Sequence, residues 1–194
     1  MRTLLPFLLL SFLFFACKKE SVSELAKPES EFSSTSNSSE PSYYENEICG
    51  LATVTSLMAG QTNNVGSVTV SNNSNFVFVT YQTTGSYLLK KTHLYVGTLA
   101  GLPVNNAGNP QIGQFPFQTN HGGGVSTYTY TIPRSSLPGG CLTVAAHAEI
   151  IAYGANGSIN YSETGWGNGT QINNGGSWAM RFSHCLQECV EGPR

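Results

Sequence analysis

The sequence contains no aspartate, and its larger part carries little charge of either sign. From Ile48 to Leu186 the only carboxylates belong to Glu149 and Glu163. The only basic side chains in that range are Lys90, Lys91, Arg134 and Arg181. Calcium sites need several carboxylate oxygens, and nucleic-acid binding needs clusters of basic residues. This composition argues against both, and we predict no metal, no cofactor and no nucleic-acid partner.

Motifs for metal-dependent or nucleophilic catalysis are also missing. The four histidines are His93, His121, His147 and His184, and none belongs to an HxH, HExxH or CxxC pattern. There is no GxSxG elbow, and no aspartate to orient a histidine. The "HGGG" at His121–Gly124 is similar to an oxyanion-hole loop of esterases, but it has no partner elbow here. We therefore predict no catalytic residue and a protein that is not an enzyme.

The N-terminal apolar run is shorter than the roughly 20 residues that a permanent membrane span requires. Arg2 followed by "LLPFLLLSFLFFA" is typical of a signal peptide, which we place at residues 1–16. Ala16 directly before Cys17 resembles the lipobox of bacterial lipoproteins. That resemblance implies a Cys17 acylated on its sulfur and on its new amino group, hence a protein that binds the membrane through a lipid anchor. The alternative is an ordinary cleaved signal followed by an unrelated cysteine.

The segment after the anchor differs sharply in composition from the rest of the chain. Residues 17–47 are rich in Ser, Glu, Pro and Asn, so they bury too little apolar surface to fold and are predicted to be a disordered tether. Lys18, rather than aspartate, follows the cysteine, which favours the outer membrane and leaves periplasmic or cell-surface orientation open. We predict one domain at residues 48–187 and a C-terminal tail at 188–194.

The domain shows a periodicity of two throughout. In "GSVTVSN", Val68 and Val70 alternate with Ser67 and Thr69, and similar stretches recur between clusters of Asn, Gly and Pro. β-Branched and aromatic residues at this spacing indicate strands. We predict an all-β fold, an antiparallel β-sandwich of about seven to nine strands.

Four cysteines besides Cys17 allow three disulfide pairings. In "CLTVAAHAEI" the even positions 142–150 form an apolar face, and Cys141 lies on the opposite, more polar face with His147 and Glu149. In "SWAMRFSHC" alternation places Cys185 with Arg181 on the polar face, and Trp178 on the apolar face, in the core. Antiparallel pairing of these strands predicts Cys141–Cys185, with Cys49–Cys189 joining the domain's ends. The sequence alone does not exclude the other pairings.

Seven segments, in order, resemble a group of secreted β-sandwich domains from otherwise uncharacterised extracellular proteins. They are "LMAGQTNNVGSVTVSNNSNFVFVTY", "THLYVGT", "GNPQIGQFPF", "YTYTIPRSSL", "LTVAAHAEI", "ETGWGNGT" and "SWAMRF". The resemblance covers nearly the whole predicted domain. It implies the fold and a secreted location, and it carries no catalytic residue.

Three groups of residues are candidates for a site. Glu149 and Glu163 are the one possible carboxylate pair of a glycoside hydrolase, but an ion pair of Glu149 with Arg181 on a polar strand-face patch with His147 explains Glu149 equally well. The aromatic residues of the connection 151–176 suit stacking on sugar rings, with Trp166 buried to hold the connection as the alternative. These residues are Tyr153, Tyr161 and Trp166.

The function predicted from these features is non-catalytic. We expect a membrane-anchored surface lipoprotein that displays its β-sandwich for binding or adhesion, with an extracellular glycan or a surface protein as partner. One alternative is a structural component of the envelope or matrix. The other is a glycoside hydrolase that uses Glu149 and Glu163.

Overall fold

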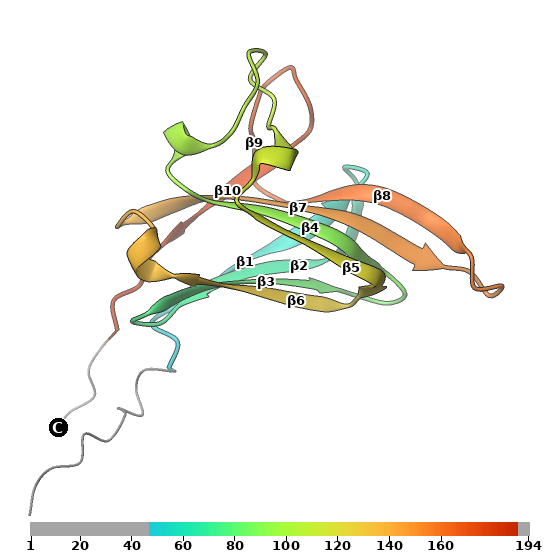
Figure 1. Ribbon diagram of the computed structural model, residues 1–194, viewed down its shortest axis with the longest axis horizontal. Helices are drawn as coiled ribbons and strands as arrows, with labels where there is room; N and C mark the ends of the chain where they lie inside the picture. Colours follow the sequence, from blue (N-terminus) through green and yellow to red (C-terminus); the bar gives the residue numbers. More distant parts are fainter. Residues whose placement is uncertain (1–46, 190–194) are drawn as a thin grey trace, which may run out of the picture. The chain divides into compact units, whose positions relative to one another are not determined.

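A computed structural model describes residues 47–189 of the chain, and these form a β-sandwich with a small lobe on one face (Figure 1). The signal peptide at 1–16, the acylated Cys17, nearly all of the tether and the last five residues lie outside the described residues. The described strands are β1 (Thr53–Ala59), β2 (Asn63–Asn72), β3 (Phe76–Thr83), β4 (Leu88–Gly97), β5 (Phe117–Val125), β6 (Thr127–Pro133), β7 (Cys141–Tyr153), β8 (Ile159–Gly167), β9 (Thr170–Gln171) and β10 (Met180–Cys185).

The strands pair in the order β5-β4-β7-β8-β1-β2-β3-β6, with every pairing antiparallel. In Figure 1 β1, β2, β3 and β6 form the lower layer, and β4, β7, β8 and β10 the upper one. The order begins and ends on β5 and β6, which only Ser126 separates in the chain. The sheet therefore curls until its two ends meet and is nearly a barrel. The prediction of an antiparallel β-sandwich is confirmed.

The main core lies between the two layers and follows the alternation in the sequence. Val68, Val70, Val144 and Ile150 are fully buried there, and their neighbours along each strand point to the opposite face. A bulge in the β1–β2 ladder brings Gly66 so close to β3 that a side chain would collide with the carbonyl of Gln82. Only glycine fits at that position.

Both predicted disulfides are present. Cys185 of β10 lies directly opposite Cys141 of β7, as the shared strand face requires, and the two are bonded. Cys49, before the first strand, is bonded to Cys189, 140 residues along the chain. The second bond joins the described ends of the chain, so the first residues of the predicted C-terminal tail are covalently part of the domain.

The outer face of β7 is not the polar, solvent-facing surface that alternation predicts. All residues from Leu142 to Ala148 are buried, including His147, which is 3% exposed. Two long connections, residues 98–116 between β4 and β5 and residues 168–179 between β8 and β10, cover this face; we call them the lobe (Figure 1). A second apolar cluster fills the space beneath them, with Ala145, Trp166 and Phe115 in it. The prediction of a polar face at this end of β7 is wrong because tertiary packing covers it.

Candidate functional site

One row of cross-strand neighbours runs beneath the lobe, from β4 across β7 and β8 to β1. His93 on β4 pairs with His147 on β7, which pairs with Trp166 on β8, which pairs with Met58 on β1. Residues directly opposite one another in antiparallel strands project from the same face. Strand register alone therefore aligns two imidazoles, an indole and a thioether side by side on the face that the lobe covers.

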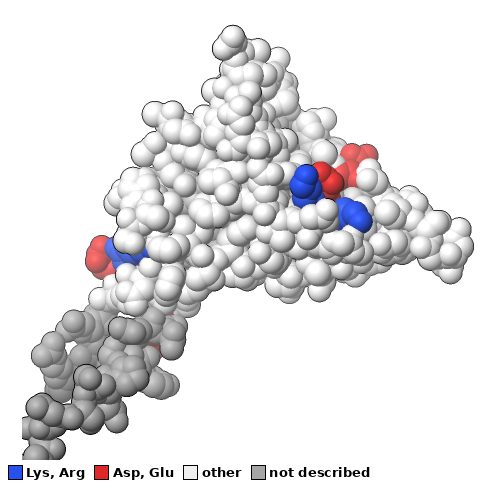
Figure 2. All heavy atoms as spheres, viewed as in Figure 1, with Lys and Arg blue, Asp and Glu red and all other residues white. Residues whose placement is uncertain are grey.

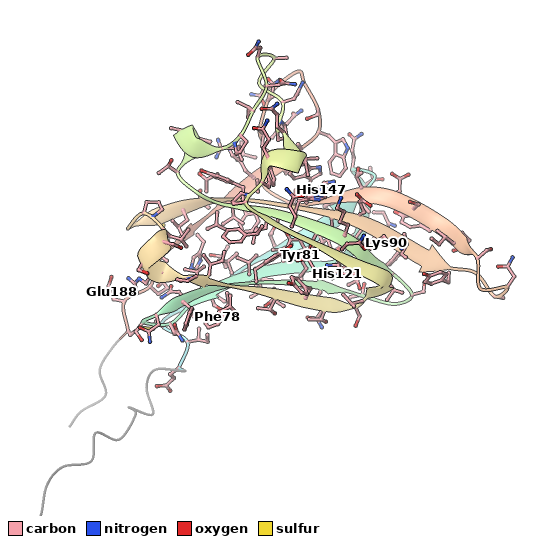
Figure 3. All side chains as sticks on the ribbon, in the orientation of Figure 1. Phe78, Tyr81, Lys90, His121, His147 and Glu188 are labelled. Carbon is pink, nitrogen blue, oxygen red and sulfur yellow. A yellow bond between two sulfur atoms is a disulfide. The ribbon has the colours of Figure 1, made fainter. Side chains whose placement is uncertain are left out.

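The two histidines form a buried pair. Their Nδ1 atoms are 3.2 Å apart, so one Nδ1–H donates to the other ring, and the ring of His147 packs 4.9 Å from that of Trp166. Burial, reinforced by the nearby His93 and Lys91, lowers the pKa of His147 to about 3. The Nε2 atom of His147 is buried and has no hydrogen-bond partner among residues 47–189. A neutral imidazole with one free polar atom therefore lies under the lobe (Figure 3).

Amide side chains join the two connections of the lobe to each other. Asn109 Oδ1 accepts hydrogen bonds from the Ser177 backbone N–H (2.9 Å) and from Asn173 Nδ2 (3.1 Å). Asn173 Nδ2 also donates to the carbonyl of Ala107 at 2.7 Å. At Gly176 a Cβ atom would collide with Asn109 and Asn173, so this close contact requires glycine. The lobe is thus a cross-linked structure rather than two independent loops.

Two hollows lie at the base of the lobe, and Trp178 is the one residue that lines both. The larger has a volume of about 290 Å³ and is lined by Asn109, Pro110, Ile112, His147, Thr164, Trp166, Ser177, Trp178 and Ala179. The smaller, of about 230 Å³, is lined by Met58, Gln61, Asn168, Gln171, Trp178 and Met180. Because Met58 and Trp166 are cross-strand neighbours, the two hollows adjoin, with Trp178 between them. Among residues 47–189, no Glu, Lys or Arg lines either hollow.

Trp178 is the residue that sequence reasoning placed wrongly. Alternation along "SWAMRF" predicted it in the core, but β10 begins only at Met180, and Trp178 is only partly buried, packed against the second apolar cluster. A hydrogen bond from the N–H of Ile172 to the carbonyl of Ala179 (2.8 Å) closes the loop that presents it. The signal that was available is the "NNGGS" directly before it, which is typical of a turn rather than of a strand.

The three predicted aromatic candidates do not come together. Trp166 is 3% exposed and holds the lobe in place, which is the alternative that the sequence left open. Tyr161 lies on the opposite face of β8, half-buried against Tyr87, with its hydroxyl accepting from Asn63. Tyr153 is 40% exposed at the far end of β7 and donates to the carbonyl of Gly123 at 2.9 Å.

The two carboxylates lie on opposite faces of the β7–β8 ladder. Glu163 pairs with Ile150, whose side chain points into the core, whereas the next residue, Glu149, pairs with Thr164 on the outer face. A glycosidase needs its two carboxyls on either side of one bond, about 5 to 10 Å apart. The register therefore gives no support to a shared site.

The expected ion pair between Glu149 and Arg181 is also wrong. The cross-strand neighbours of Glu149 are Lys91 and Thr164, whereas Arg181 pairs with Thr170 of β9. Within residues 47–189 the one salt bridge joins Arg134 to Glu188 at 3.3 Å. Figure 2 shows two small charged patches on a face that is otherwise uncharged.

No family model, curated protein or solved structure matches this chain. In the described part, no three His, Cys, Asp or Glu side chains lie close enough together to hold a metal ion. No helix among residues 47–189 has the length and apolar character needed to cross a bilayer.

Proposed function

We propose that this protein is a lipid-anchored surface protein of the bacterial outer membrane, and that its β-sandwich binds a neutral extracellular glycan without catalysis. The observation that carries the proposal is the partly buried Trp178, which lines two adjoining uncharged hollows. An indole offers a broad apolar face for the C–H face of a sugar ring, and flanking amides and hydroxyls hydrogen-bond to sugar hydroxyls. Asn109, Thr164, Asn168 and Gln171 supply such groups.

The absence of charge from the two hollows favours a neutral ligand. A charged sugar, nucleotide or peptide side chain would lose solvation in such a hollow without gaining a charged partner. A neutral sugar ring exchanges its hydrogen bonds with water for hydrogen bonds to amides and hydroxyls of the protein. It therefore loses little solvation free energy on binding. The proposal accordingly names neutral oligosaccharides as the ligand class.

Replacing Trp178 by alanine should abolish most of the glycan binding. We expect affinity for the best of a panel of neutral tetrasaccharides (cellotetraose, chitotetraose, xylotetraose, laminaritetraose and mannotetraose) to fall roughly 10- to 100-fold, the loss typical of a central tryptophan in an interface. Isothermal titration calorimetry of the purified full chain measures it. Tyr153→Ala is the matched control, since it removes an exposed aromatic remote from both hollows. If the wild-type chain binds none of the panel, or Tyr153→Ala weakens binding as much, the proposal is wrong.

The proposed anchor makes a separate prediction about Cys17. Radiolabelled palmitate fed to expressing bacteria should be incorporated into the wild-type chain and not into Cys17→Ser. The reason is that Cys17 is the only cysteine directly after the predicted signal peptide. The control is Cys141→Ser, which removes a different cysteine, one bonded to Cys185, and should keep the label. Label retained by Cys17→Ser would rule out anchoring at this residue.

A structural role in an envelope or matrix is the second candidate, and one surface favours it. On the outer face of the lower layer, Thr69, Thr80 and Thr129 lie in one cross-strand row, with the hydroxyls of Thr80 and Thr129 2.8 Å apart. Such an uncharged row of hydroxyls suits contact between copies in a hydrated assembly. Concentration-dependent self-association, measured by analytical ultracentrifugation without any glycan, would favour this role over glycan binding.

A further inference from the structure

The buried histidine beneath the lobe has a polar atom with no hydrogen-bond partner in the part of the chain that the structure describes. His147 Nδ1 is held by His93 on the neighbouring strand. Nε2 is the ring nitrogen farther from the backbone, and His147 is one of the residues that line the larger hollow. Leaving a buried nitrogen unpaired costs stability, and each such atom in a native protein calls for an explanation.

His184 provides an internal comparison. Its Nε2 is also buried without a partner, and its Nδ1 bonds to Thr53 Oγ1 at 3.0 Å. However, His184 faces inward from β10 and lines neither hollow at the lobe. Of these two histidines only His147 lines a hollow at the lobe, and two tryptophans, one amide and two hydroxyl side chains line that hollow with it.

We propose that the two hollows are adjacent subsites for successive units of one neutral oligosaccharide, and that His147 Nε2 makes the specific hydrogen bond to a hydroxyl in the larger subsite. This inference rests on the proposed function and deepens it. Trp178 separates the subsites, so the chain of sugar units passes over its indole. Gln61, Asn168 and Gln171 line the smaller subsite and accept or donate to the next unit.

A hydroxyl is the group that fits His147 in either of its tautomers. The His93–His147 pair shares one proton between two Nδ1 atoms, so Nε2 of His147 is either a donor or an acceptor. A hydroxyl both donates and accepts, whereas a carboxylate only accepts and an ammonium only donates. Neither ion would find a partner of opposite charge in the lining of the hollow.

The size of the hollows sets the length of the ligand. Each has less than the roughly 300 Å³ at the lower end of small-molecule sites, so each holds about one ring. Binding should therefore strengthen from a monosaccharide to a disaccharide, because only the longer ligand occupies both subsites and covers Trp178. Further units extend beyond the hollows and should add little.

Titration calorimetry of the purified full chain with the best tetrasaccharide of the panel, and with its mono- and disaccharide, tests the inference. We expect the disaccharide to bind at least 30-fold more tightly than the monosaccharide and within about 3-fold of the tetrasaccharide. His147→Leu should weaken binding at least 10-fold, whereas the matched control His184→Leu, which removes the other unpaired imidazole, should change it less than 2-fold.

A spectroscopic measurement on the unmodified chain guards against a variant that does not fold. In nitrogen-15 spectra of the imidazole rings, saturation with the tetrasaccharide should shift the Nε2 resonance of His147 and leave that of His184 in place. The inference would be overturned, and the proposed function left standing, if binding depends on Trp178 but the Nε2 resonance of His147 does not shift and His147→Leu binds the tetrasaccharide as tightly as the wild-type chain. Equal affinity for mono- and disaccharide would also overturn it. Failure of the whole panel to bind would remove the proposed function, and this inference with it.

Discussion

Replacing Cys49 and Cys189 together by alanine will lower the free energy of unfolding by about 5 kcal/mol. The bond closes a loop with a sequence separation of 140 residues. In the chain-entropy account, a cross-link of that span restricts the unfolded chain by roughly this amount. Urea denaturation followed by far-ultraviolet circular dichroism measures the change as a lower midpoint, with a steeper slope because the unfolded chain without the cross-link is less compact.

The second disulfide is the natural comparison. Cys141–Cys185 closes a separation of 44 residues, for which the same account gives about 4 kcal/mol. The double alanine variant of this pair should therefore lose slightly less stability than that of Cys49 and Cys189. A Cys49/Cys189 variant as stable as the wild-type chain would show that the ends of the domain are held by packing alone.

Lowering the pH from 7 to 4.5 will destabilise the fold by about 2 to 3 kcal/mol through His147 alone. Its pKa is about 3 in the folded chain, against about 6.5 when unfolded. The unfolded chain therefore binds the proton first. The stabilisation is complete above pH 6.5, and each unit below it removes about 1.4 kcal/mol until the folded pKa is reached. Burial also lowers the pKa of His184 and of His93, which adds loss in the same direction.

The composition makes this acid effect easy to attribute. The groups around His147 are His93 and Lys91 on β4 and Glu149 on its own strand. Aspartate is absent, and from Ile48 to Leu186 only two glutamates are present, so the acid response of this part of the chain is attributed mainly to its histidines. Urea midpoints at both pH values measure the loss, and His147→Leu should show a smaller difference between them. Equal stability of the wild-type chain at pH 7 and 4.5 would contradict the account.

The fold class and the Cys141–Cys185 disulfide were predictable because both depend on strand alternation, and Cys49–Cys189 was then predicted to join the ends of the domain. A period of two assigns every residue to one of two faces, and this local rule places Cys141 and Cys185 on the same one. It also predicts the core positions Val144 and Ile150 without knowledge of the sheet order. Alternation does not show which strand faces are covered by other segments of the folded chain.

The candidate site could not be predicted from the sequence, because alternation does not show which strand faces other segments cover. His147 and Trp166 meet only because β7 and β8 pair in one register, and the lobe covers them only because Asn109 and Asn173 join two distant connections. One signal was available. From Leu142 to Ala148 the sequence "LTVAAHA" has no charged residue and only one threonine and one histidine, which is typical of a strand buried on both faces.

Binding of ligand across Trp178 can be measured directly from the signal of its indole N–H. It contains only two tryptophans, so a proton–nitrogen-15 spectrum shows two indole signals. We predict that titration with the binding tetrasaccharide shifts the Trp178 signal strongly, with a smaller change at the buried Trp166. Shifts confined to residues remote from the lobe, such as Tyr153, with both indole signals unmoved, would contradict the account.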